Sequence, residues 1–189
     1  MRISPVIPVL AIVLGLAFAS PLAALPADLH WGMGEEACTE ALLAAGYAKI
    51  AEEIPERSED RKLRRHAIMG GIRWRYFEKR RGKAREELTI LLYNDSLFRV
   101  RENHSDFGPK LKEEIIERLT REFSSAPRQI DNPGRLENRR APIERYAWSR
   151  ATTTALFSYQ RIPRISLLFA EIDYFDRPIY EKLKNAALQ

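Results

Sequence analysis

The strongest chemical signal in this 189-residue sequence is a basic stretch between Arg57 and Arg85. It holds twelve Lys or Arg residues against three acidic residues, a net of +9 in a chain of formal charge +5, so the remainder is net acidic. Charge concentrated in this way can steer an anionic partner, although such stretches often only solvate a face or keep an edge strand from pairing. The candidate surface for an anionic partner consists of Arg73, Arg75, Lys79, Arg80, Arg81, Lys83 and Arg85.

Metal chemistry has little support in the sequence. The three histidines, His30, His66 and His104, lie in different predicted elements, and no His-Glu-x-x-His or Cys-x-x-Cys spacing is present. His104 can meet Asp95 and Asp106 near a hairpin end, but polar loop residues gather in this way without binding zinc or calcium. We therefore expect no metal site and no cofactor.

Catalytic residues are equally sparse. Ser124, Ser125 and Ser158 lie in no nucleophile-elbow motif. Glu171 and Asp173 are two residues apart on a predicted strand, so they share one face. A catalytic pair of carboxylates needs a shared cleft, and we expect this pair to be structural. The sequence thus predicts a protein that is not an enzyme, with an envelope hydrolase using a hidden carboxylate or histidine site as the alternative.

The candidate basic residues lie on a predicted β-hairpin. Residues 72–77 alternate between aliphatic or aromatic and basic side chains, which predicts a half-buried strand with Trp74 and Tyr76 inward and Arg73 and Arg75 in solvent. Residues 80–83 form the predicted turn. Strands over 88–93 and 97–101 follow, joined by an Asn94-Asp95 turn.

Two helices flank these strands in the sequence. The first begins with Glu35 and Glu36 and ends at Gly46, with an apolar stripe that includes Cys38 and Leu42. The second begins at Gly108-Pro109 and ends before Pro127. Its inner face carries a row of apolar residues four apart: Leu111, Ile115, Leu119 and Phe123. Its solvent-facing side carries two pairs of opposite charge, Glu114 with Arg118 and Glu117 with Arg121.

The remaining segments complete an α+β pattern. A short strand over 47–54, a charged segment over 57–65 and a long loop over 128–142 are predicted. Strands over 145–149, 153–159 and 165–174 follow, with Pro163 at the last turn. Asp176 is expected to cap a final helix, whose inner face carries Ile179, Leu183 and Ala187. The order helix–strands–helix–strands–short helix favours an antiparallel sheet backed by helices on one face.

The first residues have the composition of a secretory signal. Arg2 precedes an apolar run over residues 6–19, and small residues follow. We expect a leader over 1–24, cleaved between 19 and 24, and a single domain over 25–189 in the bacterial periplasm. An uncleaved inner-membrane anchor over 6–19 is the alternative. Cys38 is the only cysteine, so it forms no intramolecular disulfide, and we expect a buried side chain on a helix face.

Short motifs along the predicted domain resemble a known group. They are Trp31-Gly32-Met33-Gly34 before a helix, the hairpin Tyr93 to Val100, a helix ending in Phe123 and Pro127, the lone Trp148, and Asp173-Tyr174. This pattern resembles small exported bacterial envelope proteins with a Trp-Gly-Met-Ser start and the β-lactamase-inhibitor-protein-like fold. Here Gly34 stands in place of the serine, and Ser124 in place of a glycine. The resemblance implies a helix-backed antiparallel sheet that serves in binding or assembly, and it supplies no catalytic residue.

Together these features predict a non-catalytic, exported binding or envelope-assembly module that uses its basic strand and hairpin face. An envelope protein, an anionic lipid or an acidic glycan would be the partner. Because the leader predicts export, no nucleic-acid partner is expected. A protein held at the membrane surface by an uncleaved signal and the basic face remains a further alternative.

Overall fold

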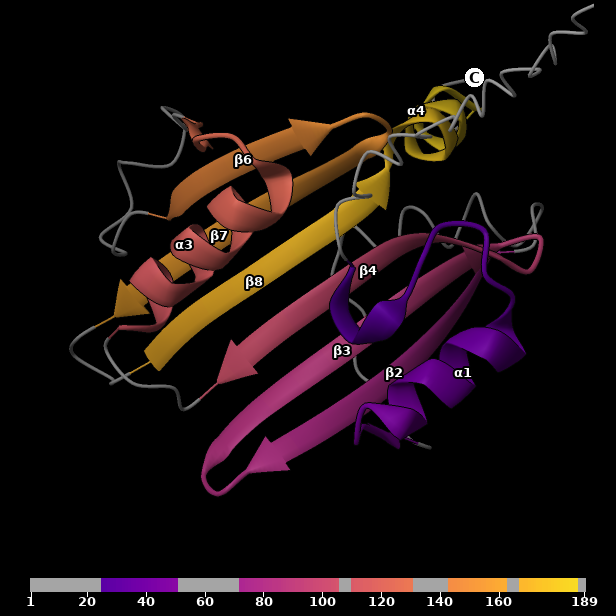
Figure 1. Cartoon of the computed structure of the whole chain (residues 1–189), viewed down its shortest axis with the longest axis horizontal. Coiled ribbons are helices and arrows are strands. Elements are labelled where there is room, and N and C mark those ends of the chain that lie inside the picture. The colour runs from indigo at the N-terminus through magenta and orange to yellow at the C-terminus, as the bar shows by residue number, and fades with distance from the viewer. Residues whose placement is uncertain (1–24, 51–71, 106–109, 131–142, 163–166, 187–189) are drawn as a thin grey trace, which may run out of the picture.

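Eight antiparallel strands form one open sheet in the computed structural model, which describes residues 25–50, 72–105, 110–130, 143–162 and 167–186 (Figure 1). The fold class is α+β, as predicted. The described elements, in chain order, are η1 (Pro26–Asp28), α1 (Glu35–Ala44), β1 (Ala48–Lys49), β2 (Ile72–Arg81), β3 (Ala84–Tyr93), β4 (Ser96–Ser105), α3 (Leu111–Phe123), β5 (Arg128–Gln129), β6 (Glu144–Arg150), β7 (Thr153–Ile162), β8 (Leu167–Asp176) and α4 (Arg177–Ala186).

The chain passes through the same plan twice. The sheet order is β1-β2-β3-β4-β8-β7-β6-β5, so each run of four strands builds one side of the sheet. The first half, residues 35–105, comprises α1 and β1 to β4, and the second half, residues 111–176, comprises α3 and β5 to β8. The halves meet where β4 pairs antiparallel with β8, from Arg99 opposite Phe175 to His104 opposite Ala170. We call this β4–β8 junction the seam.

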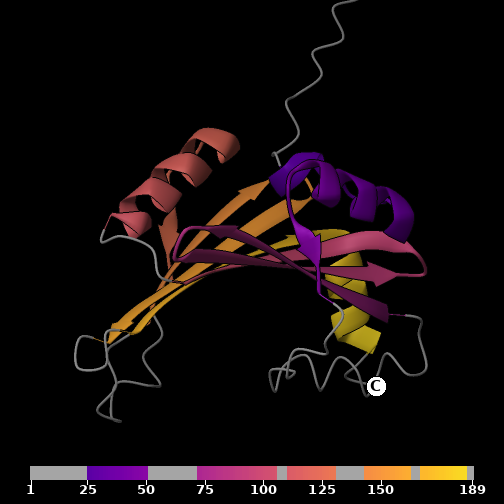
Figure 2. The ribbon, with the colours of Figure 1, turned by 90° about the horizontal axis from the view of Figure 1, so that it is seen from below.

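The helices occupy both faces of the sheet. Helices α1 and α3 cover one face, here called the helix face, while α4 lies on the other, here called the α4 face (Figure 2). The Tyr180 ring of α4 packs on Phe175 of β8 with ring centroids 4.6 Å apart. The final helix therefore departs from the predicted single helical layer. Its Asp176 cap is confirmed, because the Ile179 amide donates to the Asp176 carboxylate at 3.5 Å.

The main core lies between the sheet and α1 and α3. All four residues of the predicted α3 row are buried, and so are Cys38 and Leu42 of α1. The strands complete the core with apolar side chains on the helix face: Phe77, Leu88, Ile90, Leu92, Leu97, Val100, Trp148, Ala155, Phe157, Ala170, Ile172 and Tyr174. Burial of these side chains supplies the main driving force for folding.

The segment before α1 belongs to this core. Leu25 and Leu29 are buried, and Trp31 donates through Nε1 to Thr153 Oγ1 of β7 at 2.8 Å. The Met33 carbonyl accepts from the Leu97 amide of β4 at 2.8 Å. Residues 25–34 therefore span the seam and contact both halves.

Turn residues form the predicted connections. Asn94 and Asp95 both have positive φ, 50° and 62°, which is the type I′ geometry that matches the twist of a hairpin. Gly46 ends α1 at φ 85°, and Gly82 turns the β2–β3 hairpin at φ 63°. Such angles strain residues that carry a Cβ atom.

The predicted facing of the second strand is wrong. Phe77 is buried in the core, and because strand side chains alternate, Arg73 and Arg75 share its face beneath α1. Trp74 and Tyr76 lie half-buried on the α4 face. A period of two determines which residues share a face of the strand. Because both faces carry apolar side chains, the pattern did not determine which face points toward the core.

Other boundaries also differ from prediction. The first strand is confined to Ala48–Lys49 within the described residues, and β5 forms inside the predicted 128–142 loop. The predicted strands of the two hairpins are confirmed and extend further. The leader, the 57–65 segment, the Gly108-Pro109 helix start, the Pro163 turn, Ala187 and the remainder of the 128–142 loop from 131 onward lie outside the described residues.

Candidate functional site

The seven candidate basic residues are distributed over both faces of the β2–β3 hairpin. Arg73, Arg75, Lys79 and Arg81 project on the helix face, and Arg80 and Arg85 on the α4 face, while Lys83 lies in the turn. They therefore do not form one continuous basic face. Most of them are engaged in contacts within the protein.

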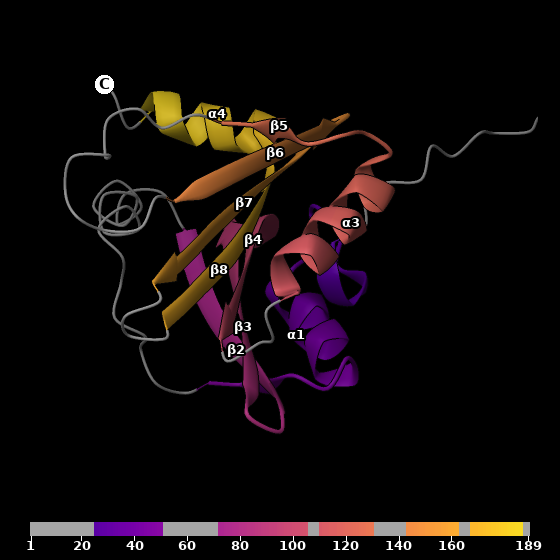
Figure 3. The same cartoon turned by 90° about the vertical axis from the view of Figure 1, so that its left-hand side faces the viewer.

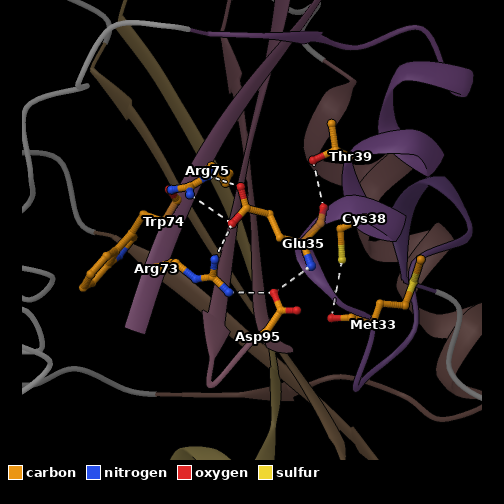
Figure 4. A network of polar contacts seen from close by, with 8 residues as sticks. All are labelled: Met33, Glu35, Cys38, Thr39, Arg73, Trp74, Arg75 and Asp95. Carbon is orange, nitrogen blue, oxygen red and sulfur yellow. Dashed lines mark hydrogen bonds and ion pairs between the residues drawn. The ribbon is translucent and has the colours of Figure 1, made fainter. Parts of the chain in front are cut away.

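Arg73 and Arg75 hold the start of α1 through Glu35 (Figure 4). Arg75 donates through Nε and Nη2 to the two Glu35 carboxylate oxygens at 2.5 Å and 2.9 Å. Arg73 reaches Glu35 at 3.0 Å and Asp95 at 2.7 Å. Asp95 also accepts from the Glu35 backbone amide at 3.1 Å, and so caps α1 from the β3–β4 turn. These two arginines orient a helix, and Arg73 remains 44% exposed as it does so.

Lys79 and Arg85 are engaged in the same way. Lys79 donates to the Ala45 carbonyl at the end of α1 at 2.6 Å, with its ammonium 5.3 Å from the centre of the Tyr47 ring. Arg85 lies 3.1 Å from Glu78 and 2.9 Å from Glu87. Arg85 is neutralised by two carboxylates, Lys79 is held at the end of α1, and both contacts stiffen the hairpin.

The end of the hairpin remains available. Arg81 and Lys83 are exposed, and neither forms an ion pair with any described residue. Arg80 is 67% exposed and, among the described residues, forms an ion pair with Glu78 at 3.3 Å. We call Arg80, Arg81 and Lys83 the tip. The β2–β3 turn that carries them extends beyond the ends of α1 and α3 (Figures 1 and 3).

A second polar group, missed by the sequence analysis, lies under α3. Glu102 of β4 is completely buried on the helix face. Its Oε2 accepts from Arg118 of α3 at 2.8 Å and lies 3.2 Å from His104 Nε2. Arg118 also contacts the Tyr174 hydroxyl of β8 at 3.3 Å. The predicted wet-side pair of Arg118 with Glu114 is therefore wrong, because Arg118 turns inward to Glu102.

The electrostatics of this buried group follow from its partners. Burial disfavours the charge on Glu102, but attraction to Arg118, aided by His104, outweighs burial and holds the Glu102 pKa below its ordinary value. For Glu122, one turn beyond Arg118, burial outweighs the attraction to Arg118 and raises the carboxyl pKa. Burial also raises the pKa of the Tyr174 hydroxyl.

One sequence signal pointed to this group. Val100, Glu102 and His104 alternate on one strand face, so extending the predicted 97–101 strand by four residues would have placed a carboxylate and an imidazole in the core. The partner was not visible, because Arg118 is local to neither residue. Only the packing of α3 over β4 brings it within hydrogen-bonding distance.

Glu171 and Asp173 share the α4 face, as predicted. Arg99 donates to the two Asp173 oxygens at 2.8 Å and 2.5 Å, and Arg101 Nε lies 3.7 Å from Glu171 Oε2. Both carboxylates are thus held by arginines of β4 across the seam. This is the arrangement of structural ion pairs.

The other candidate groups are dispersed. Asp95 lies in the turn before β4 and His104 lies near the other end of that strand, so the considered site near the hairpin end does not form between them. Asp106 and His66 lie outside the described residues. Among the described residues, no three His, Cys, Asp or Glu side chains are placed to hold a metal. Cys38 is buried as predicted, and burial, with Asp95 and Glu35 nearby, raises the thiol pKa to about 11.

Within the described part of the chain, no helix has both the length and the apolar composition to cross a membrane. Comparison with known protein families, with curated proteins and with solved structures finds no match. The resemblance to envelope proteins stays a prediction.

Proposed function

We propose that the protein is a non-catalytic, exported binding or envelope-assembly module that contacts an acidic partner protein through the tip. One observation carries this proposal. Arg81 and Lys83 have no ion-pair partner in the described structure, whereas the other cations of the hairpin, apart from Arg80, are held by helix α1 or by strand carboxylates. Export and an envelope location enter through the predicted leader.

The hairpin is suited to present this charge. Strands β2 and β3 pair continuously from Ile72 opposite Tyr93 to Arg81 opposite Ala84. Contacts with Glu35 and Ala45 brace the helix face of the hairpin, and the ion pair between Glu78 of β2 and Arg85 of β3 links its strands on the α4 face. A braced hairpin loses little conformational entropy when a partner docks, which favours binding. Charges at its end accelerate association with an oppositely charged surface.

The size of the tip favours a protein over a membrane. A basic residue near an anionic bilayer contributes about 1 kcal/mol, so the three tip residues supply about 3 kcal/mol. That corresponds to a Kd weaker than about 1 mM. A protein partner can add apolar and hydrogen-bonded contacts around the same charges, so an acidic protein surface fits the tip better than an anionic lipid or glycan.

The hydrolase alternative has two places to consider, Glu102 with His104 and Glu171 with Asp173. In both places arginines already bind the carboxylates, at 2.8 Å for Glu102 and at 2.5 Å for Asp173. A general acid at neutral pH needs a raised pKa, whereas the Glu102 pKa lies below its ordinary value. We therefore favour binding over catalysis.

Affinity capture from an envelope extract tests the proposal with a matched pair of charge reversals. The first variant combines Arg81→Glu with Lys83→Glu at the tip. The second combines Lys110→Glu with Lys182→Glu, which are also exposed cations and give the same change in net charge. We expect a stoichiometric protein to be captured by the wild type and the second variant, and lost with the first.

Equal capture by both variants would place the binding surface elsewhere. Capture of anionic vesicles or acidic glycan alone, removed from the wild type by high salt, would replace the protein partner with a surface-attachment role. Thermal unfolding of both variants should match the wild type, since exposed substitutions of this kind change stability by less than about 0.5 kcal/mol.

A further inference from the structure

Buried charges gather at the seam on both faces of the sheet. On the α4 face, Arg99 of β4 is paired with Asp173 of β8. On the helix face, Glu102 of β4 is paired with Arg118 of α3. One apolar core runs across the seam on the helix face, and the junction of the two halves also carries these ion pairs. A charged junction depends on protonation state in a way that an apolar core does not.

Helix α3 is tied to its own half by its remaining polar contacts. Lys112 donates to Glu144 of β6 at 2.6 Å, and Trp148 of β6 donates to Thr120 at 3.4 Å. Arg150 of β6 donates to the Glu122 carbonyl at 3.3 Å. The Arg118–Glu102 bond, in contrast, reaches across the seam to the first half.

We propose that the Glu102–Arg118 pair is an acid-released lock, in which protonation of Glu102 frees α3 from the first half while the sheet stays folded. The inference is independent of the proposed binding role of the tip. It assigns the protein a conformational response to the acidity of its surroundings.

The surroundings of Glu102 decide how the lock responds. Arg118 and Glu122 face it from α3, Tyr174 from β8 and His104 from β4 itself. Tyr47 and Glu86, hydrogen-bonded to each other, lie on the α1 side of the group. Arg118 is its nearest fixed positive charge and stays protonated throughout, so protonation of Glu102 leaves this guanidinium without its counter-ion. The Arg118 side chain is 34% exposed, but its Nε is buried without a hydrogen bond, and an unpaired charge that is partly buried destabilises the position that holds it.

The direction of the pH effect follows from the shifts. The Glu102 pKa is lowered in the folded protein, so its contribution is complete above the ordinary carboxyl pKa and is lost as pH falls through the lowered value. The Glu122 pKa is raised by burial, so Glu122 takes up its proton at a higher pH. That first protonation removes an unfavourable buried charge and does not open the lock.

Hydrogen exchange measured on the purified protein between pH 7 and pH 3 tests the proposal. Protection factors, corrected for intrinsic exchange, are compared for peptides of α3 (111–123) and β3 (84–93). In the wild type we expect the protection factors of α3 to fall by up to about tenfold for each pH unit by which the solution is acidified. This is the slope for the uptake of one proton. The β3 peptide should stay protected over that range.

Three variants separate the lock from general acid unfolding. Glu102→Gln should give low α3 protection at every pH, with the one-proton slope removed. The double variant Glu102→Met with Arg118→Met replaces the pair by apolar side chains of similar length, an exchange that buried ion pairs often tolerate. It should fold and show no acid loss of α3 protection. Glu114→Gln removes an exposed carboxylate from the same helix and should keep the wild-type slope.

Two results would overturn the proposal. One is a double variant that folds and retains the wild-type slope, which would assign the proton to another group. The other is simultaneous loss of α3 and β3 protection with the same slope in the wild type, which would mean that the whole sheet unfolds in acid.

Discussion

The two halves share one topology but attach their helices by different chemistry. Helix α3 buries a row of four apolar residues, from Leu111 to Phe123, on its own side of the sheet. Helix α1 buries only Cys38 and Leu42, and ion pairs at Glu35 and a lysine at its last carbonyls hold its two ends. The same helix-on-sheet plan can thus be maintained by apolar area in one half and by charge in the other.

This difference sets what each half can do. Apolar burial is worth about 25 cal/mol per Å² and is not weakened by electrostatic screening, whereas partly exposed ion pairs contribute little and are screened. The first half uses four of its hairpin cations internally, which leaves the tip as the exposed basic end of the hairpin. The second half has a firmly seated helix from which Arg118 reaches the seam.

The largest expected effect comes from the apolar row. Leu119→Ala should lower the free energy of unfolding by about 2–5 kcal/mol, because the side chain is fully buried and a cavity would remain. Leu43→Ala in α1 serves as the control. Because the Leu43 side chain is 51% exposed, this substitution should change the free energy of unfolding by less than about 0.5 kcal/mol. Chemical denaturation measures both. Equal small losses would contradict the apolar attachment of α3.

The helix ends give the next largest effect. Gly46 ends α1 at φ 85°, so Gly46→Ala should cost about 1–2 kcal/mol through backbone strain, since the space around it is adequate. The equivalent end of α3 is Ser124 at φ 51°, where Ser124→Gly should not destabilise. Thermal unfolding compares the two. A harmless Gly46→Ala would show that the left-handed angle at this end is not required.

The charged attachment of α1 should be weaker. Glu35→Ala removes the contacts to Arg73 and Arg75 and should lower the free energy of unfolding by about 1 kcal/mol at low salt. The difference should shrink in 1 M salt, where screening is strong. Glu36→Ala, at the exposed neighbouring position, is the matched control. A salt-independent loss of the same size would point to packing instead of charge.

The smallest effect has the opposite sign. Glu122→Gln should stabilise the protein at pH 7 by a few tenths of a kcal/mol, because burial raises the pKa of this carboxyl and so disfavours its charged form. The gain should vanish as pH falls below the ordinary carboxyl pKa, where the wild-type side chain is also neutral. Urea denaturation at pH 7 and pH 4 measures this. A loss of stability at pH 7 would mean that attraction to Arg118 exceeds the cost of burial.

Local patterns predicted most of the elements. The spacing of Leu111, Ile115, Leu119 and Phe123 gave α3 and its buried face, and Asn94-Asp95 gave the hairpin turn. The predicted facing of β2 failed because Trp74 and Tyr76 alternate with Phe77, so both faces of the strand carry apolar side chains. The two-residue strand β5 had no pattern to reveal it, since a strand this short exists only through pairing with β6.

For the candidate site too, some features were predictable from the sequence and others were not. The sequence by itself determined the charge of the β2–β3 hairpin, the alternation of its strands and the α+β order, because these depend on residues close together in the chain. Only the tertiary structure decided which cations remain free and which carboxylates are buried, because Glu35, Glu102 and Asp173 meet their arginines across separate elements. The energies of these ion pairs depend on distance and burial, and both are determined only when the strands pair and the helices pack on the sheet.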